Sequence, residues 1–289
     1  MIDAHLHLWD PAQLHYDWLR HVPTIAGRQD PEAWAALQTG VRRAVFVQAD
    51  CAPDQALAEV DWVASLSHPT LEILGVVAFA PLELGEAVGG HLEALLQRPQ
   101  VRGVRRSVQN EPDEFITDPR HLDGLVAVAQ RGLAIDMCAR DHQLPLVIRV
   151  LDALFDRVPD ARVVLDHLGK PDIAAHVGDI QGADWALNLR QLAAYPNVFA
   201  KLSGLTTQDH WTEGRDATLA PYIRHALKCF GPERLMFGGD WPVVDLAGGY
   251  ARWLALFKTV TTALPPRDRL RIEAGTATQF YALAPEPLA

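Results

Sequence analysis

Eight short apolar segments alternate with longer helical segments along the chain, and this alternation constrains the fold more than any other feature of the sequence. The segments recur at intervals of roughly thirty to forty residues, the length of one strand, one helix and their loops. We expect strands at Ile2–Leu8, Ala44–Gln48, Ile73–Ala80, Val101–Val108, Leu133–Cys138, Val163–His167, Val198–Leu202 and Leu235–Gly239. Apolar residues at helical spacing predict helices at Leu144–Phe155 and Trp185–Leu192, and a further helix is expected at Arg267–Leu283.

Strands that alternate with helices predict a parallel sheet. Eight strands in a chain of 289 residues favour an α/β architecture of the (β/α)8 barrel type. An open doubly wound sheet is the alternative, although no glycine-rich phosphate loop follows the first strand. Because no linker or change of composition divides the chain, we expect residues 1–289 to form one catalytic domain. In such a barrel the functional side chains stand at the C-terminal ends of the strands.

The composition argues against several classes of partner. The formal net charge of -10 disfavours nucleic acid and anionic membranes as ligands. No apolar run is long enough to span a bilayer, and no signal peptide precedes the first strand, so a cytoplasmic location is expected. Cys51, Cys138 and Cys229 are widely spaced and odd in number, which indicates free thiols rather than a disulfide framework or a zinc ribbon.

The last expected strand ends in a carboxylate beside an indole. The apolar run 235–237 is followed by two glycines, by Asp240 and by Trp241. The glycines leave room for the close approach of a ligand or a neighbouring strand. A desolvated carboxylate is costly unless it has a partner or a function. Asp240 is therefore a candidate catalytic residue, with a surface turn as the structural alternative.

The first and fourth strands also end in residues that suit chemistry. His5 and His7 lie two apart and are expected on one side of the first strand, together with Asp3. Arg105 lies near the end of the fourth strand, where its guanidinium can bind a carboxylate or polarise a carbonyl. The structural alternatives are satisfied core histidines and an arginine at the rim of the barrel.

The sixth and seventh strands add His167 and Lys201 at the same end. His167 is in phase with Val163 and Leu165 along its strand. Any one of these charged residues would be unremarkable by itself. Their convergence is what favours a site, and the expected cluster comprises His5, His7, Arg105, His167, Lys201 and Asp240.

Five motifs, taken in chain order, resemble the amidohydrolase superfamily. They are His-Leu-His-Leu-Trp-Asp-Pro at 5–11, Gly-Val-Arg at 103–105, Asp-His-Leu-Gly-Lys-Pro at 166–171, Lys-Leu-Ser-Gly at 201–204 and Phe-Gly-Gly-Asp-Trp-Pro at 237–242. Within the superfamily they are similar to the amidohydrolase-related branch that holds sugar-lactone hydrolases such as L-fuconolactonase and L-rhamnonolactonase. The resemblance implies hydrolysis of a small lactone, with a sugar (aldono-) lactone as the expected substrate.

The roles that fit this reaction follow from the residue types. Asp240 would take a proton from the attacking water. His167, Arg105 and the histidines of the first strand, His5 and His7, would donate hydrogen bonds to the developing oxyanion. Trp9, Trp241 and Trp211 are candidates for stacking on a sugar face, and Lys170 and Lys201 for binding hydroxyls or a carboxylate.

Two positions depart from the two-metal members of the superfamily. Those members place a Lys or Glu on the fourth strand and a His on the fifth, where this chain has Arg105 and Asp-Met-Cys at 136–138. We therefore expect that no cofactor is required. His5, His7 and Asp240 have the ligand types for at most one divalent ion, such as zinc. A metal-dependent decarboxylase of the same superfamily and a non-catalytic carbohydrate-binding barrel are the alternative functions.

Overall fold

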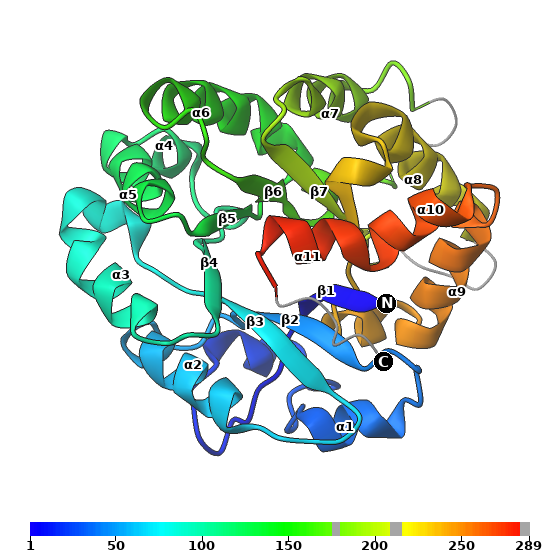
Figure 1. Cartoon of the computed structure of the whole chain (residues 1–289), viewed down its shortest axis with the longest axis horizontal. Coiled ribbons are helices and arrows are strands. Elements are labelled where there is room, and N and C mark those ends of the chain that lie inside the picture. The colour runs from blue at the N-terminus through cyan, green and yellow to red at the C-terminus, as the bar shows by residue number, and fades with distance from the viewer. Residues whose placement is uncertain (175–179, 209–215, 284–289) are drawn as a thin grey trace.

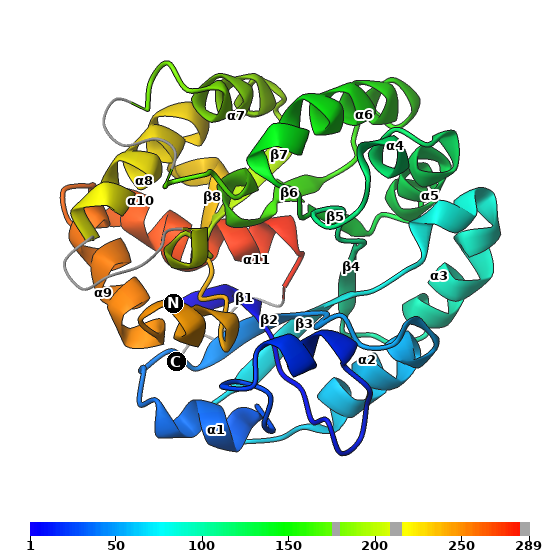
Figure 2. The same cartoon turned by 180° about the vertical axis from the view of Figure 1, so that it is seen from behind.

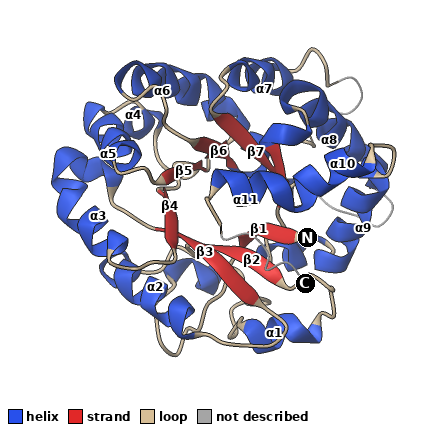
Figure 3. Cartoon of the chain, viewed as in Figure 1, coloured by secondary structure: helices blue, strands red, loops and turns tan. Residues whose placement is uncertain are grey.

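All eight expected strands are present, and each pairs in parallel with the next along the chain. The computed structural model describes residues 1–174, 180–208 and 216–283. The strands are β1 (Ile2–Leu6), β2 (Arg43–Val47), β3 (Glu72–Ala78), β4 (Val101–Arg105), β5 (Ala134–Met137), β6 (Val163–Leu165), β7 (Val198–Leu202) and β8 (Leu235–Phe237). The expected (β/α)8 barrel is confirmed, and the open sheet is not (Figure 1, Figure 3).

The barrel closes between the end of β1 and the segment after β8. Asp240 N donates to His5 O, and His7 N donates to Trp241 O, both at 2.8 Å. Leu6 and Trp241 form a parallel bridge between the two segments. These backbone hydrogen bonds join the first strand to the segment after the last strand, so the closure itself places two histidines beside an aspartate.

Helices surround the barrel on its outer side, and the last one lies across one end of it (Figure 1, Figure 2). They are α1 (Pro31–Ala36), α2 (Ala56–Ser65), α3 (Gly89–Leu96), α4 (Asp113–Ile116), α5 (Pro119–Gln130), α6 (Leu144–Arg157), α7 (Asp184–Ala194), α8 (Asp216–Phe230), α9 (Tyr250–Thr261), α10 (Pro266–Leu270) and α11 (Thr276–Phe280). The expected helix at 267–283 is divided into α10 and α11 by a π-helical turn at Arg271–Gly275. None of the helices in the described ranges is long and apolar enough to cross a bilayer.

Two apolar clusters hold these layers together. The larger one fills the space between the strands and the outer helices. The smaller one fills the interior of the barrel, where Val164 and Met236 pack with Phe280 and Tyr281 at the end of the chain. α11 thereby covers one end of the barrel, and the loops that follow the strands surround the other end. A cleft that leads into the barrel is therefore expected at the loop end.

Candidate active site

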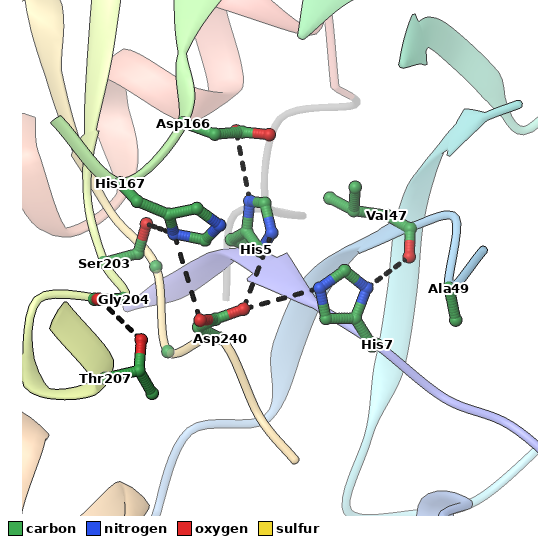
Figure 4. A network of polar contacts seen from close by, with 12 residues as sticks. His5, His7, Val47, Ala49, Asp166, His167, Ser203, Gly204, Thr207 and Asp240 are labelled. Carbon is green, nitrogen blue, oxygen red and sulfur yellow. Dashed lines mark hydrogen bonds and ion pairs between the residues drawn. The ribbon is translucent and has the colours of Figure 1, made fainter. Parts of the chain in front are cut away.

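Asp240 lies at the loop end of the barrel among three imidazole rings (Figure 4). Its Oδ1 is 3.4 Å from His7 Nε2 and 3.8 Å from His5 Nε2, while its Oδ2 is 3.9 Å from His167 Nδ1. All four side chains are buried. The predicted convergence of these four residues is therefore present in the structure.

β1 does not keep the regular alternation that we expected. Its pairing with β2 shifts register between Asp3 and Leu6. Ala4 belongs to the interior cluster, and His5 also contacts interior side chains, so the strand presents two successive residues to the inside. Asp3 instead accepts a hydrogen bond from the hydroxyl of Tyr250 on α9 and another from Gly239 N. The expectation that Asp3 shares the side of the histidines was wrong because a bulge of this kind reverses the alternation.

The left-handed backbone conformation of His167 brings its ring into the site, and the alternation of side chains along β6 does not. Val163 and Leu165 pack in the outer cluster, whereas Val164 packs in the interior. The predicted phase of His167 would therefore point it outward, and that prediction was wrong. A φ of 53° at His167 turns the chain back over the barrel, and its Nδ1 lies 2.9 Å from Ser203 Oγ.

The approach of β7 to this ring requires a glycine. Gly204 has a φ of +60°, and a Cβ there would lie 2.4 Å from His167 Nδ1 and 3.1 Å from Asp240 Oδ2. Both the backbone conformation and the missing side chain are needed at this position. The Ser-Gly pair after β7 thus positions His167 directly against the carboxylate.

A cleft of about 610 Å³ opens above these residues. It is lined by His7, Trp18, Ala49, Asp50, Arg105, Gln109, Asn110, Cys138, His167, Lys170, Asp240 and Val243. Positive φ angles occur at four of the residues that line the cleft, none of which is a glycine: Asp50, His167, Lys170 and Asp240. Left-handed conformations of such residues are costly and concentrate at functional sites.

Three residues that we expected to bind substrate are buried away from the cleft lining. Trp9 is fully buried, and its Nε1 donates to the carbonyls of Ile25 and Gly27. Trp241 is also buried, and its indole donates to Asp245 Oδ2. Lys201 has 0% exposure beneath the site. Trp211 lies outside the described residues, while Lys170 does line the cleft.

Trp18 is the indole that reaches the cleft, and sequence reasoning did not identify it. It belongs to a short 3-10 helix, Asp17–His21, that follows β1. Its ring packs edge-on against Trp9 at 5.2 Å between ring centroids, and its indole donates to Ala49 O at 2.8 Å. No strand carries it, so strand-based reasoning could not place it. The same is true of Gln109 and Asn110, which follow β4 by several residues.

A charged network lies directly beneath the cleft. Arg105 Nη2 donates to Gln48 O at 2.6 Å, and its Nη1 lies 3.5 Å from Asp166 Oδ2. Lys201 Nζ pairs with Asp166 and Asp136, and the Tyr281 hydroxyl donates to both carboxylate oxygens of Asp136.

Sequence reasoning did not assign a site role to Asp136 or Asp166. The signal was present in the phase of β6, because Asp166 follows the interior residue Val164 by two positions.

The surroundings set the charges of the central groups. Burial would raise the pKa of Asp240, but His167, His7 and Lys170 outweigh it and hold this pKa below its usual range. Burial, assisted by neighbouring cations, holds the pKa values of His5 and His167 well below their usual range. The site therefore combines an ionised carboxylate with two neutral imidazoles near pH 7.

The cluster also has the donor types of a metal site. His5, His167 and Asp240 each offer one ligand atom, and these atoms all lie within 4.8 Å of one another. This set differs by one residue from the predicted His5, His7 and Asp240. Two imidazoles and one carboxylate suit a single divalent ion such as zinc.

Burial also perturbs Glu59, which supports the wall of the cleft from α2. It is fully buried, and its Oε1 accepts a hydrogen bond from Ala49 N at 3.1 Å. Burial raises its pKa from 4.5 to about 8. The folded protein therefore keeps a proton that the unfolded chain releases above pH 4.5, and this contribution to stability is lost as the pH rises toward 8.

We expect Glu59→Gln to remove that pH dependence. Gln keeps the acceptor for Ala49 N but carries no titrating proton, so the variant should gain melting temperature relative to the parent as the pH is raised from 5 to about 8. Melting curves over this range, with the exposed Glu86→Gln as control, measure the effect. Parallel curves for parent and Glu59→Gln would contradict the assignment.

Comparison with known proteins adds the family. The family model described as "Amidohydrolase" matches residues 2–283. An L-fucono-1,5-lactonase of Burkholderia ambifaria is 32% identical and covers 98% of this chain and 95% of its own. An L-rhamnono-gamma-lactonase of Scheffersomyces stipitis is 27% identical, over 72% of this chain and 66% of its own.

Solved structures agree with this assignment. A crystal structure of an amidohydrolase from Burkholderia multivorans with bound zinc superimposes with a TM-score of 0.84 at 29% identity, covering 98% of this chain and 99% of that one. The match extends over the barrel, from the histidines of β1 to the segment after β8 that carries Asp240. Because the family model matches nearly the whole chain and the strands form the same kind of barrel, this chain belongs to the amidohydrolase family.

Proposed function

We propose that this protein hydrolyses a small sugar lactone by attack of water on the ring carbonyl, with Asp240 as the general base. The observation that carries the proposal is an ionised Asp240 beside three imidazoles at the floor of a cleft that opens to solvent. The similarity to lactonases of L-fucono-1,5-lactone and L-rhamnono-gamma-lactone supports this class of substrate.

The reaction divides into two proton transfers. Asp240 takes a proton from water as the water oxygen bonds to the ring carbonyl, and the carbonyl becomes an oxyanion. The oxyanion then collapses, the bond to the ring oxygen breaks, and the proton held by Asp240 passes to the leaving alkoxide. Water is consumed, and the product is an open-chain hydroxy acid.

Arg105 and the imidazoles supply the electrostatic part of the mechanism. Arg105 is anchored by Gln48 O and Asp166, and it lines the cleft as a fixed cation. His5 and His167 are neutral donors beside the carboxylate. Donors that are fixed before the reaction stabilise an oxyanion by about 10²–10³-fold each, so their combined effect is large without a single dominant group.

The remaining lining groups suit a substrate that carries hydroxyls. Lys170, Gln109 and Asn110 present donors and acceptors to the cleft, and Trp18 presents an aromatic surface. Gln109 Oε1 is buried and has no partner in the described structure, so an incoming hydroxyl would satisfy it. Of the substrate-binding residues predicted from the sequence, we retain Lys170 alone.

We further propose that this reaction needs no metal. β4 carries Arg105 and β5 carries Asp136 where two-metal relatives place ligands, and Lys201 supplies a cation within the same network. A divalent ion held by His5, His167 and Asp240 would polarise a carbonyl or acidify water. A cyclic ester already reacts more readily than an amide, so the side chains present can suffice.

A lactone panel tests the proposed function. We expect turnover of aldonolactones, including L-fucono-1,5-lactone and L-rhamnono-gamma-lactone, to be seen as acid release with a pH indicator after subtraction of spontaneous hydrolysis. A parallel assay follows CO2 release from aromatic carboxylates. Release of CO2 without lactone turnover would identify a decarboxylase, and sugar binding without either reaction would identify a non-catalytic barrel.

Asp240→Asn should abolish turnover while leaving the fold in place. Asn preserves the size of the side chain but cannot accept the proton of water, so kcat should fall by at least about 10²–10⁴-fold. The melting temperature and the bound metal content are measured on the same sample, with the surface variant Asp61→Asn as control. A kcat within tenfold of the parent would move the base elsewhere, and we would then assign it to His167.

Chelation tests the proposed independence from metal. Activity should largely survive prolonged treatment with a chelator, and elemental analysis should find at most one divalent ion per chain. The reason is the ligand set, which lacks the histidine of the fifth strand. Two ions per chain, together with activity lost on chelation and restored by zinc, would show that the ligand count is wrong.

A further inference from the structure

The ammonium of Lys201 lies beneath the cleft, in contact with three acceptor groups. Its Nζ is 3.0 Å from His5 Nδ1 and 3.0 Å from Asp166 Oδ1, and it donates to Asp136 Oδ2. The side chain has no exposure to water. His5, Asp136 and Asp166 are also a set whose ligand atoms lie close enough together to hold a metal ion. In this chain a lysine cation contacts all three.

The hydrogen-bonding capacity of an ammonium fixes what His5 does at this contact. Lys201 has three protons to donate and no acceptor, and water cannot reach it. His5 Nδ1 must therefore accept, because a protonated Nδ1 would set two donors 3.0 Å apart. Asp166 Oδ1, at 3.2 Å from Nδ1, is the competing partner, and the contact of Nδ1 with Lys201 Nζ is the shorter of the two, at 3.0 Å.

The proton of the neutral ring then lies on the other nitrogen. His5 Nε2 faces the site, 3.8 Å from Asp240 Oδ1. Arg105 Nη1 is the competing donor to this nitrogen, at 3.4 Å from Nε2, and it also lies 3.5 Å from Asp166 Oδ2. Lys201 Nζ approaches the ring more closely, at 3.0 Å from Nδ1. The nearer cation, Lys201, thus determines the tautomer.

We propose that Lys201 is a positioning residue that fixes His5 as the Nε2–H tautomer, so that His5 donates a hydrogen bond toward the reacting group. The catalytic consequence rests on the proposed lactone hydrolysis, whereas the tautomer itself does not. This gives the buried lysine a role that differs from the substrate contact expected from the sequence.

The same tautomer opposes metal binding. An imidazole binds a metal ion through an unprotonated nitrogen, and Nε2 is the His5 nitrogen that faces Asp240. While Nδ1 accepts a hydrogen bond from Lys201, the ring proton lies on Nε2, and Nε2 cannot bind a metal ion. Removal of the ammonium would let Nδ1 donate to Asp166 and would free the Nε2 lone pair. Lys201 therefore favours hydrogen-bond donation over metal ligation at this histidine.

Nitrogen NMR of the imidazole rings tests the tautomer directly. Two-bond proton–nitrogen spectra distinguish a protonated ring nitrogen from an unprotonated one, and a His5→Gln sample assigns the signals. The parent should show a protonated Nε2 and an unprotonated Nδ1, and Lys201→Met should show the reverse. The surface variant Lys258→Met should match the parent. A protonated Nδ1 in the parent, or no change in Lys201→Met, would overturn the proposal.

Two further readouts separate this role from a merely structural one. Lys201→Met should lose about 10²–10³-fold in kcat with little change in KM, as expected for a lost oxyanion donor. Zinc titration by calorimetry should show at least tenfold tighter binding to Lys201→Met than to the parent. Lys170→Met is the matched control, because it removes a nearby positive charge without touching Nδ1. An equal gain in zinc affinity for both variants would mean that charge alone is responsible.

A second variant and the spectrum of the parent keep the proposal testable if Lys201→Met does not fold or if no lactone is hydrolysed. Lys201→Met leaves Asp136 without its cation and leaves Asp166 paired with Arg105 alone, so the double variant Lys201→Met with Asp136→Asn provides a second sample with less uncompensated charge. The spectrum of the parent needs neither variant and decides the tautomer by itself. If no lactone is hydrolysed, the proposed function fails, while the nitrogen spectrum still supports or overturns the role of Lys201.

Discussion

Two backbone hydrogen bonds between the end of β1 and the segment after β8 determine the geometry on which the site depends. They join residues more than two hundred positions apart, and each of these segments carries catalytic candidates. Asp240 N binds the carbonyl of His5, so the carboxylate and the ring are held by the same pair of strands. Closing the barrel and assembling the site are therefore one event, and loosening the closure would separate the base from its donors.

The charged layer beneath the cleft is stable only because its members compensate one another. Burying a single ion costs several kcal/mol, and good pairing with hydrogen bonds offsets that cost. Burial raises the pKa of Asp136 to about 6 despite Lys201 beside it. Asp166 is held ionised, because Lys201 and Arg105 outweigh the effect of its burial on the pKa. This layer sets the electrostatic surroundings of the rings above it.

The sequence was sufficient to predict the architecture and the main cluster. Each of the eight strands could be located because a buried parallel strand is a short apolar run, and the polar residues after such runs gather at one end of a barrel. The order of the motifs also identified the family. These features depend on local composition and on one topological rule, which a single sequence contains.

The errors arose where the backbone departs from regular geometry. A bulge in β1 turned Asp3 to the outer side, and a left-handed residue brought His167 inward. Neither changes the apolar pattern, so alternation alone could not reveal them. Trp9, Trp241 and Lys201 were expected at the substrate because they adjoin catalytic motifs, yet all three serve the packing or the charge network. Proximity in sequence does not determine which side chains reach a cleft.

The central claim is that the site operates with an ionised Asp240 and neutral imidazoles. The dependence of kcat/KM on pH tests it most directly. Because the pKa of Asp240 is lowered and those of His5 and His167 lie well below 6.5, we predict a constant kcat/KM from about pH 5 to pH 8. The acid limb should lie below the ordinary range of an aspartate. A limb with an apparent pKa between 6 and 7, of the kind produced by an essential histidine base, would contradict this account.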